Sequence, residues 1–269
     1  MKTLVFLLGM LTVGACAPLK IHERTPSRPL SRDEFLLEQT RREEKLTSVE
    51  GKLHVRYSIK QGSFSGDARF IKHEGQSRFE VSDPMGRVRY WLIGDPMGIL
   101  AFYDSDQIAY SAGDGGRNYF RKFFGMTLTC QELENLWTGV LPKTWREKMT
   151  ETWLNDSGVY RGQIEKEKGQ LIQFEVSENN REIKRVFLNQ EKNSFEVTFD
   201  DFDSCCAQGG TELILGHAVA IKLPDPAEKI ELEWDVLNIL GQTPNPLSFN
   251  KKLGGRVKVI SLDKERKRP

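Results

Sequence analysis

Apolar and polar residues alternate one by one along most of this chain, and this period favours a fold built mainly from β-strands. Leu53, Val55 and Tyr57 alternate with polar neighbours, as on a strand with one face against a core. Similar segments recur at short spacing between turn-forming residues, which favours an antiparallel sheet. The first group is Phe64–Ile71, Arg78–Val81, Val88–Ile93, Ile99–Tyr103 and Gln107–Tyr110, and the second is Thr152–Leu154, Val159–Ile164, Leu171–Val176, Lys184–Leu188, Phe195–Phe199, Leu213–Leu223, Ile230–Val236 and Arg256–Leu262.

Helical patterns occur before the first group of strands and between the two groups. The segment Ser31–Glu34 has the capping-box pattern and leads into a predicted helix at Asp33–Leu46. Asn118–Phe124 has aromatic residues at helical spacing, and a second capping box begins at Thr129. The sequence therefore predicts an α+β fold, with helices segregated to one face of a curved antiparallel sheet.

The first residues have the three parts of a signal peptide. Lys2 supplies a positive charge, Leu4–Val13 is apolar, and two small residues follow. The apolar run is too short to span a bilayer comfortably. Val13–Cys16 also resembles a bacterial lipobox, in which cleavage removes residues 1–15 and Cys16 becomes the acylated first residue. The alternative is an ordinary signal peptide with an incidental cysteine.

The residues after Cys16 set the expected location and the domain boundary. Ala17 and Pro18 follow the cysteine, without the aspartate that resembles an inner-membrane retention signal. We therefore expect attachment to the outer membrane on its periplasmic face, and two or more acyl chains would make that attachment stable. Residues 16–30 are polar and proline-containing, as expected of a lipidated tether, and residues 31–269 suit a single domain.

The charge balance argues against nucleic acid as a partner. Removal of residues 1–15 takes away Lys2 and leaves 38 basic against 38 acidic side chains. Nucleic-acid binding requires a basic face, and the basic stretch Lys264–Arg268 is short and terminal. Apart from the anchor, the mature chain is expected to be soluble and monomeric.

Sequence patterns for catalysis or metal binding are weak. Nucleophile elbows, Walker loops and dinucleotide fingerprints are absent from the sequence, and its histidines do not occur at ligand spacing. Asp200, Asp201 and Asp203 could attract calcium but lack the glycine and the terminal glutamate of an EF-hand, which favours a solvated turn. We therefore expect neither enzymatic activity nor a cofactor, although a non-contiguous catalytic triad stays open.

Three cysteines remain besides Cys16. Cys205 and Cys206 are neighbours, with Cα atoms about 3.8 Å apart, below the usual disulfide range of about 4.4–6.8 Å. One of them could pair with Cys130, or none could. In either case at least one of the three has no disulfide partner within a monomer.

The apolar face of the sheet has two interpretations. It can be an ordinary core filled by the helices that cover it. It can also be the wall of a cavity between sheet and helices that holds acyl chains, because small-molecule sites are concave and mainly apolar. The residue pattern by itself favours the filled core.

Several short segments between Ser48 and Trp145 occur in a characteristic order. They are Gly51–Val55, Phe79–Gly86, Gly98–Asp104, Tyr110–Ala112 and Phe123–Leu128. Trp137–Pro142 follows and is similar to a Trp-x-x-Gly-x-Pro signature, with its glycine one place early. In this order the segments resemble the LolB family of outer-membrane lipoprotein receptors, which have the LolA/LolB-like fold.

The resemblance implies a half-barrel that encloses an apolar cavity. It also implies that the cavity accepts acyl chains of lipoproteins from a periplasmic carrier and passes them to the outer membrane without a cofactor. The inward face is assigned by alternation, so a slip of one residue would invert the assignment on a strand. The residues expected at the cavity are Phe79, Val81, Val88, Tyr90, Leu92, Leu100, Phe102, Leu133, Leu136 and Trp137.

Two departures from the LolB pattern support an alternative. Family receptors carry a protruding hairpin with a large apolar residue at its tip, whereas the hairpin expected there, His73–Ser77, is polar. Met97, in a later turn, is a poor substitute for that apolar tip residue. The chain is also longer, through the loop at Cys205–Cys206 and the segment Gly241–Gly255. The alternative is a structural or interaction lipoprotein of the cell envelope that keeps the fold with a filled core.

Overall fold

Every strand overlaps a segment for which the sequence predicts a strand. The computed structural model describes residues 31–59, 62–149, 154–156, 159–166, 170–177, 182–189, 194–205, 213–225, 227–240 and 253–263. The strands are β1 (Ser48–Ile59), β2 (Gly62–His73), β3 (Gln76–Ser82), β4 (Val88–Gly94), β5 (Gly98–Tyr103), β6 (Ile108–Gly113), β7 (Leu154–Asp156), β8 (Val159–Lys166), β9 (Gln170–Ser177), β10 (Ile183–Asn189), β11 (Phe195–Cys205), β12 (Leu213–Lys222), β13 (Lys229–Ile239) and β14 (Lys258–Ser261). The helices are α1 (Arg32–Lys45), the 3₁₀ turn η1 (Asp114–Gly116), α2 (Arg117–Phe124), α3 (Cys130–Trp137) and α4 (Lys143–Arg146).

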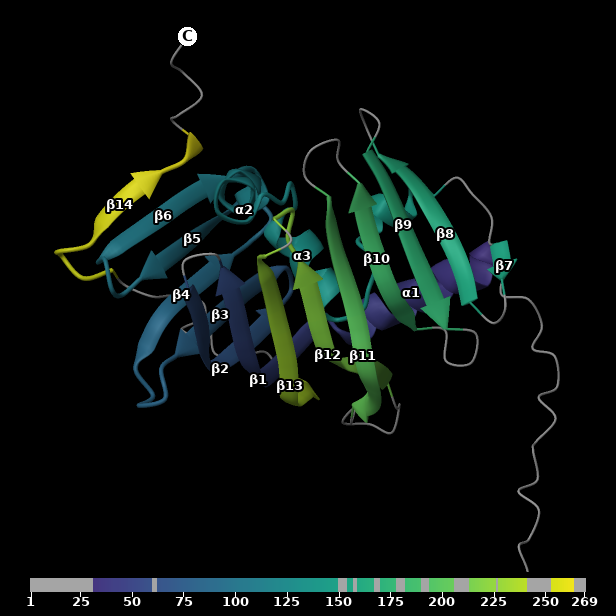
Figure 1. The fold of residues 1–269 in the computed structure, drawn as a ribbon, viewed down its shortest axis with the longest axis horizontal. Coiled ribbons are helices and arrows are strands. Elements are labelled where there is room, and N and C mark those ends of the chain that lie inside the picture. Colours follow the sequence, from purple (N-terminus) through teal and green to yellow (C-terminus); the bar gives the residue numbers. More distant parts are fainter. Residues whose placement is uncertain are drawn as a thin grey trace, which may run out of the picture.

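The strands form one 14-stranded sheet in the order β14-β6-β5-β4-β3-β2-β1-β13-β12-β11-β10-β9-β8-β7 (Figure 1). Strands β1 to β6 make one antiparallel meander and β7 to β13 make a second. The two meanders join where β1 pairs with β13, from Val49 opposite Ile239 to Ser58 opposite Lys229. The prediction of a curved, mainly antiparallel sheet is confirmed, and the exception is β14, which pairs with β6 in parallel.

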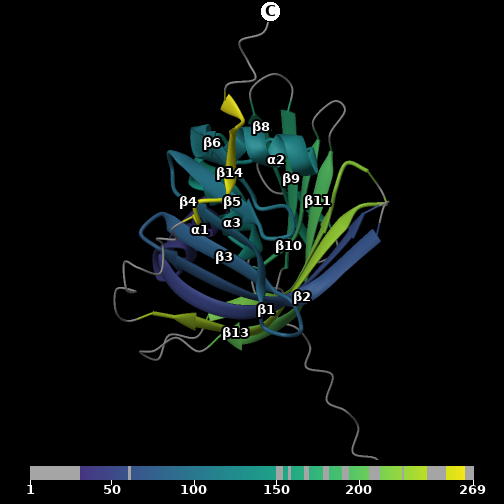
Figure 2. The same ribbon diagram turned by 90° about the vertical axis from the view of Figure 1, so that its left-hand side faces the viewer.

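The helices lie on one face of the sheet, which curves around α2 and α3 (Figure 2). Capping boxes start α1 and α3, as the sequence predicts. In α1 the Ser31 hydroxyl accepts from the backbone N–H of Glu34 at 3.2 Å, and the Glu34 carboxylate accepts from the Ser31 N–H at 3.1 Å. In α3, Thr129 and Glu132 make the same exchange. The short elements η1 and α4 add to the predicted helical pair.

Helix α1 connects the second meander to the helices between the meanders. The Phe35 ring stacks on Phe174 of β9 at 5.5 Å, and the Arg42 guanidinium donates to the carbonyl of Ile214 in β12 at 2.9 Å. On the same buried face of α1, the Gln39 side-chain oxygen accepts from the Leu141 N–H at 2.8 Å. The buried core therefore continues from one meander to the other.

Some predictions fall on parts of the chain that the structure does not describe. They concern the signal peptide at residues 1–15, the lipidated Cys16, the tether at 16–30, the residue Cys206 and most of the 241–255 segment. Within the described ranges, no helix is long and apolar enough to cross a membrane.

Candidate functional site

A cavity of about 490 Å³ lies between the sheet and helices α2 and α3. This volume falls within the range of about 300–1,000 Å³ that is typical of small-molecule sites. Most of the lining is apolar or aromatic. The lining residues are Val55, Tyr57, Phe64, Phe70, Ser77, Phe79, Val81, Arg89, Tyr90, Leu92, Tyr103, Ser105, Phe120, Phe124, Met126, Cys130, Leu133, Glu134, Trp137, Ile230 and Leu232.

Strand register explains why these side chains share one face. Residues paired across neighbouring strands point to the same side of a sheet. Phe70 of β2 lies opposite Phe79 of β3, and Val81 of β3 lies opposite Tyr90 of β4. Val55 of β1 pairs with Leu232 of β13, so the junction of the two meanders also contributes to the cavity.

Helices α2 and α3 cover the cavity without filling it. Gly125 caps the C-terminus of helix α2, with a φ of 68° in the left-handed region that glycine adopts readily. The chain then turns into Met126 at the cavity. Trp137 of α3 packs its ring 5.2 Å from Phe79 and 6.1 Å from Phe70. The covering helices thus contact the sheet through aromatic side chains.

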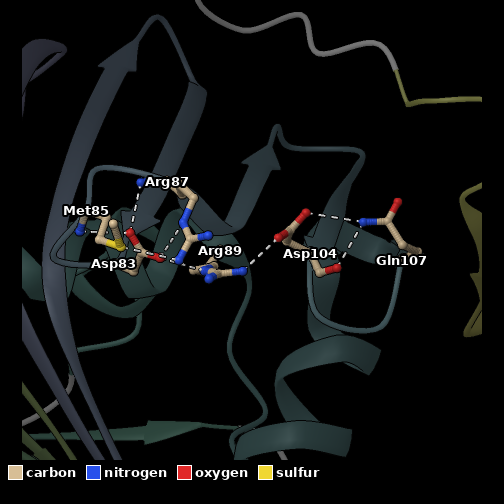
Figure 3. A network of polar contacts seen from close by, with 6 residues as sticks. All are labelled: Asp83, Met85, Arg87, Arg89, Asp104 and Gln107. Atoms are coloured by element: carbon tan, nitrogen blue, oxygen red, sulfur yellow. Dashed lines mark hydrogen bonds and ion pairs between the residues drawn. The ribbon is translucent and has the colours of Figure 1, made fainter.

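One end of the cavity reaches the surface. Ser105 is exposed, and Phe64 is 38% exposed. Arg89 lines this open end and is held by two carboxylates (Figure 3). Its Nε donates to Asp83 Oδ2 at 3.0 Å and its Nη1 donates to Asp104 Oδ2 at 3.1 Å. These bonds orient the guanidinium at the entrance.

The turn after β3 shapes the same open end. The Asp83 carboxylate accepts from the backbone N–H groups of Arg87 and Met85, each at 3.0 Å, and from two guanidinium groups. The Arg87 N–H is the main cause of a lowered pKa of Asp83, with smaller contributions from the Arg89 and Arg87 side chains. The turn leaves the Met85 side chain 79% exposed.

The hydroxyl groups of three tyrosines form hydrogen bonds with one another in and behind the cavity wall. The Tyr119 hydroxyl lies 3.2 Å from the Tyr90 hydroxyl and 2.6 Å from the Tyr103 hydroxyl. Burial raises the pKa of Tyr103 to about 12 and raises those of Tyr90 and Tyr119 well above the usual value. The phenols therefore stay neutral at physiological pH, and their oxygens are already paired.

The other end of the cavity is closed and polar. Ser77, Cys130 and Glu134 line it and are each at most 4% exposed. The Cys130 thiol donates to Glu134 Oε1 at 3.0 Å and lies 3.7 Å from the Ser77 hydroxyl. Burial raises the pKa of Glu134, an effect opposed by the Lys72 ammonium, and raises that of Cys130 well above normal.

Cys130 also bears on the predicted disulfide chemistry. Among the cysteine side chains that the structure describes, Cys130 is buried and free. This agrees with the expectation that at least one of Cys130, Cys205 and Cys206 has no disulfide partner. The Cys205 side chain and Cys206 lie outside the description.

The structure places many of the expected cavity residues together. Phe79, Val81, Tyr90, Leu92, Leu133 and Trp137 line the cavity. Leu136 is fully buried in the core and is not part of the lining. Val88 is also outside the lining, because the β3–β4 register shifts between Val81 and Ser82 and breaks the alternation on β4.

Strand β5 corrects the expected inward face. Phe102 pairs with Trp91, stacks on it at 5.5 Å and so lies opposite the cavity face. Leu100, two residues away, lies on that same outer face. The inward residue next to Leu92 is Ala101, which is fully buried. The prediction that Leu100 and Phe102 face the cavity is therefore wrong by one residue. Both faces of this strand are apolar, so alternation does not indicate which face points inward.

Part of the lining was not predicted from sequence. Ile230 and Leu232 reach the cavity only because β13 pairs with β1 across a long stretch of sequence. Alternation predicts that Tyr57 lies on the buried face of its strand, but it cannot distinguish a cavity wall from a filled core. Glu134 gave no signal, because a single acidic residue on a short helix usually faces solvent.

The polar groups around the cavity are paired or buried, and most of the wall is apolar. In the described part of the chain, no three histidine, cysteine, aspartate or glutamate side chains come together as a metal site requires. The tyrosine hydroxyls are mutually paired, and the Cys130 thiol is held protonated by burial. The wall therefore offers mainly apolar surface to a ligand, with polar groups at its two ends.

Comparisons with known proteins identify the fold. No protein-family model and no curated protein matches the sequence. A domain from Vibrio parahaemolyticus, whose name ascribes it to outer-membrane lipoprotein sorting, superposes with a TM-score of 0.56 at 14% identity, covering 81% of this chain and 95% of that one. A LolA superfamily protein from Nitrosomonas europaea gives a TM-score of 0.51 at 10% identity, covering 83% and 99%.

A DUF1329 family protein from Desulfovibrio piger is similar to the same extent, with a TM-score of 0.58 at 10% identity over 81% of this chain and 96% of that one. At such identities the likeness concerns the fold. The protein has the LolA/LolB-like fold, a large curved sheet that is mainly antiparallel, with a few helices on one face.

Proposed function

We propose that this protein is a lipid-anchored lipoprotein on the periplasmic face of the outer membrane. It accepts acyl chains of other lipoproteins in its cavity and helps to localise them to that membrane. Residues 1–15 are its signal peptide, Cys16 carries the lipid, and a periplasmic carrier delivers the cargo. The protein acts by binding and is not an enzyme.

The cavity is the observation that carries this proposal. Its lining is mainly aliphatic and aromatic, and one end is open. An acyl chain gains about 0.8 kcal/mol for each CH₂ group that it buries, so even part of a chain in this space would bind measurably. The fold, shared with a domain named for lipoprotein sorting and with a LolA superfamily protein, is compatible with this role.

Exposed apolar residues at the open end support contact with a membrane. The β2–β3 turn at Glu74 and Gly75 is short and polar, so it offers little to a bilayer. The turn after β3 instead exposes Met85. Its position beside the cavity entrance would bring a membrane surface close to the cargo that leaves the cavity.

The alternative, a structural lipoprotein with a filled core, is favoured by the polar β2–β3 turn. The cavity opposes it, because protein interiors are normally packed with few voids larger than a water molecule. A direct binding measurement separates the two functions.

A substitution that fills the cavity tests the proposal. Leu92 lines the cavity, and Leu100 lies on the opposite face of the neighbouring strand. We expect Leu92→Trp to weaken binding of a fluorescent acyl probe about tenfold or more, because displacing two CH₂ groups from contact already costs about 1.6 kcal/mol. Leu100→Trp, the matched control, should bind like the wild type. Probe titration of the three proteins provides the measurement.

Thermal melting of the same proteins shows whether each variant is folded. A wild-type protein that binds no acyl probe would contradict the proposal and leave the structural lipoprotein standing. Equal loss of affinity in folded Leu92→Trp and Leu100→Trp proteins would also count against this cavity as the binding site.

The anchor is tested separately. We expect Cys16→Ala to abolish incorporation of radiolabelled palmitate and to remove the protein from outer-membrane fractions, because acylation requires the cysteine thiol. Cys130→Ala serves as the control and should label normally. Palmitate incorporation into Cys16→Ala at the wild-type level would show that the Val13–Cys16 segment is not a lipobox.

A further inference from the structure

The cavity runs along the strands, so strand register gives its length. At the open end, Phe64 of β2 lies opposite Tyr57 of β1, and both residues line the cavity. At the closed end, Ser77 of β3 lines the cavity and pairs with Lys72, which follows Phe64 along β2. Because a strand rises about 3.3 Å per residue, the levels of Phe64 and Lys72 are about 26 Å apart.

The volume of the cavity matches one hydrocarbon chain of similar length. A methylene group is close in size to a water molecule, which takes up about 30 Å³ in the liquid. The cavity of about 490 Å³ therefore holds about 16 such groups. Two chains of that length would need about twice the volume.

The length of the cavity leads to a similar number of carbons. An extended chain advances about 1.25 Å per bond, because its bonds are about 1.5 Å long and its angles are near 111°. With a contact distance of about 4 Å subtracted at the closed end, the space admits an extended chain of about 18 carbons. Volume and length thus agree on a single chain without folds.

The closed end stops a chain that enters from the open end. The Cys130 sulfur of α3 lies 3.7 Å from the Ser77 hydroxyl of β3, so helix and sheet are in direct contact there. Both side chains are buried. In the same part of the cavity, the Trp137 ring of α3 packs 5.2 Å from the Phe79 ring. A chain that reached this contact would have to separate α3 from the sheet to advance further.

The open end suits the polar head of the ligand. Arg89 and the exposed Ser105 line this end, and the rest of the wall is mainly apolar. A carboxyl or ester group keeps its hydrogen bonds to water at this end, whereas burial among apolar side chains would be costly. The chain therefore enters with its methyl end first.

We propose that the cavity takes one acyl chain at a time, in extended form, and that its closed end limits this chain to about 16 to 18 carbons. A cargo with several acyl chains inserts one of them, and the others stay outside. This inference rests on the proposed function, since it names the number and the length of the chains that the cavity takes.

A series of saturated fatty acids tests the limit. Fatty acids of 12, 14, 16, 18 and 20 carbons compete with a fluorescent acyl probe for the full chain. Up to the limit, each added pair of carbons should tighten binding about tenfold, because two more CH₂ groups are buried. Beyond it, the dissociation constant should change by less than about twofold, because the added carbons stay in water. At saturating palmitate, native mass spectrometry should detect one bound chain per protein.

Two variants shift the limit in opposite directions. Leu92 pairs with Phe79 near the closed end, so Leu92→Trp shortens the cavity and should lower the limit by about two carbons. Trp137→Leu removes a ring from the same end and should raise the limit by about two carbons. Leu100→Trp, on the outer face of β5, is the matched control and should leave the limit unchanged. Thermal melting verifies folding, and either cavity variant suffices if the other does not fold.

The outcomes separate this inference from the function on which it rests. Wild-type affinity that still rises about tenfold from 18 to 20 carbons, or two palmitates bound per protein, would overturn the single-chain limit while acyl binding stands. A limit that stays the same in a folded Leu92→Trp or Trp137→Leu protein would also overturn it. If the wild type binds neither the fatty acids nor the probe, the proposed acyl-binding function fails as well.

Discussion

Single residues decide how closely α3 approaches the sheet at the closed end of the cavity. Gly94 is the last residue of β4, and a Cβ added there would lie 2.5 Å from the Cys130 sulfur and 3.3 Å from the Ser77 hydroxyl. The first distance is shorter than any ordinary contact. The absence of a side chain at Gly94 therefore lets the thiol pack against the strand and reach Glu134.

This contact leads to a stability prediction. We expect Gly94→Ala to lower the free energy of unfolding by about 1–3 kcal/mol, because a methyl group must displace Cys130 or shift the strand. Cys130→Ala removes the sulfur that the added methyl group would meet. The double mutant should therefore lose less free energy of unfolding than the sum of the losses in the two single mutants. Urea denaturation of the four proteins in the cycle measures this coupling.

Gly254→Ala provides the matched control for this cycle. An added Cβ there meets nothing within 4 Å and φ is not positive, so its stability should equal that of the wild type within about 0.5 kcal/mol. The contact with Cys130 would not be tight if Gly94→Ala had the stability of the wild type. The same would follow if the stability losses of the two single mutants simply added in the double mutant.

Residue-level assignments were predictable only where one face of a strand is clearly polar. On β3, Arg78 and Glu80 pair with each other on the outer face, so Phe79 and Val81 could only face inward. On β5 both faces are apolar, and the larger side chains, such as Phe102, were wrongly assigned to the cavity. Size and hydrophobicity do not determine direction when a partner covers the outer face, as Trp91 does here.

At the scale of elements, local signals predicted well and long-range pairing did not. The capping boxes at Ser31 and Thr129 involve side chains three residues apart, so a short sequence window contains the whole interaction. The pairing of β1 with β13 joins two segments that are separated by most of the sequence. It brings Leu232 to the cavity, and no local pattern encodes it.

Strand β14 shows the same limitation. Its alternation predicts a strand, but its parallel pairing with β6 depends on contacts distant in sequence. The Asp263 carboxylate accepts from the Gly113 N–H at 2.7 Å and from the Asn118 side chain at 3.0 Å, and Leu262 is buried in the core. These contacts fix β14 along the outer side of β6, where it covers backbone groups that an edge strand would leave unpaired.

At the scale of the whole molecule, the cavity and the distant meander share one core. The cavity is built from β1 to β5, β13 and the helices that follow the first meander. Helix α1 connects this part to the second meander through Phe35 against Phe174 and through the Arg42–Glu182 ion pair at 3.1 Å. Both Arg42 and Glu182 are buried, so separating the two parts would break a buried ion pair.

Because of these connections, we expect a ligand in the cavity to stabilise both meanders together. A ligand at a concentration of about 100 times its dissociation constant stabilises the native state by about 2.7 kcal/mol. The slowest amide hydrogens should then exchange about 100-fold more slowly, in β9 around Phe174 as well as in β3 around Phe79. Hydrogen exchange with and without saturating palmitate measures the effect. Slower exchange in β3 with no change in β9 would contradict a shared core and would mean that the second meander opens independently.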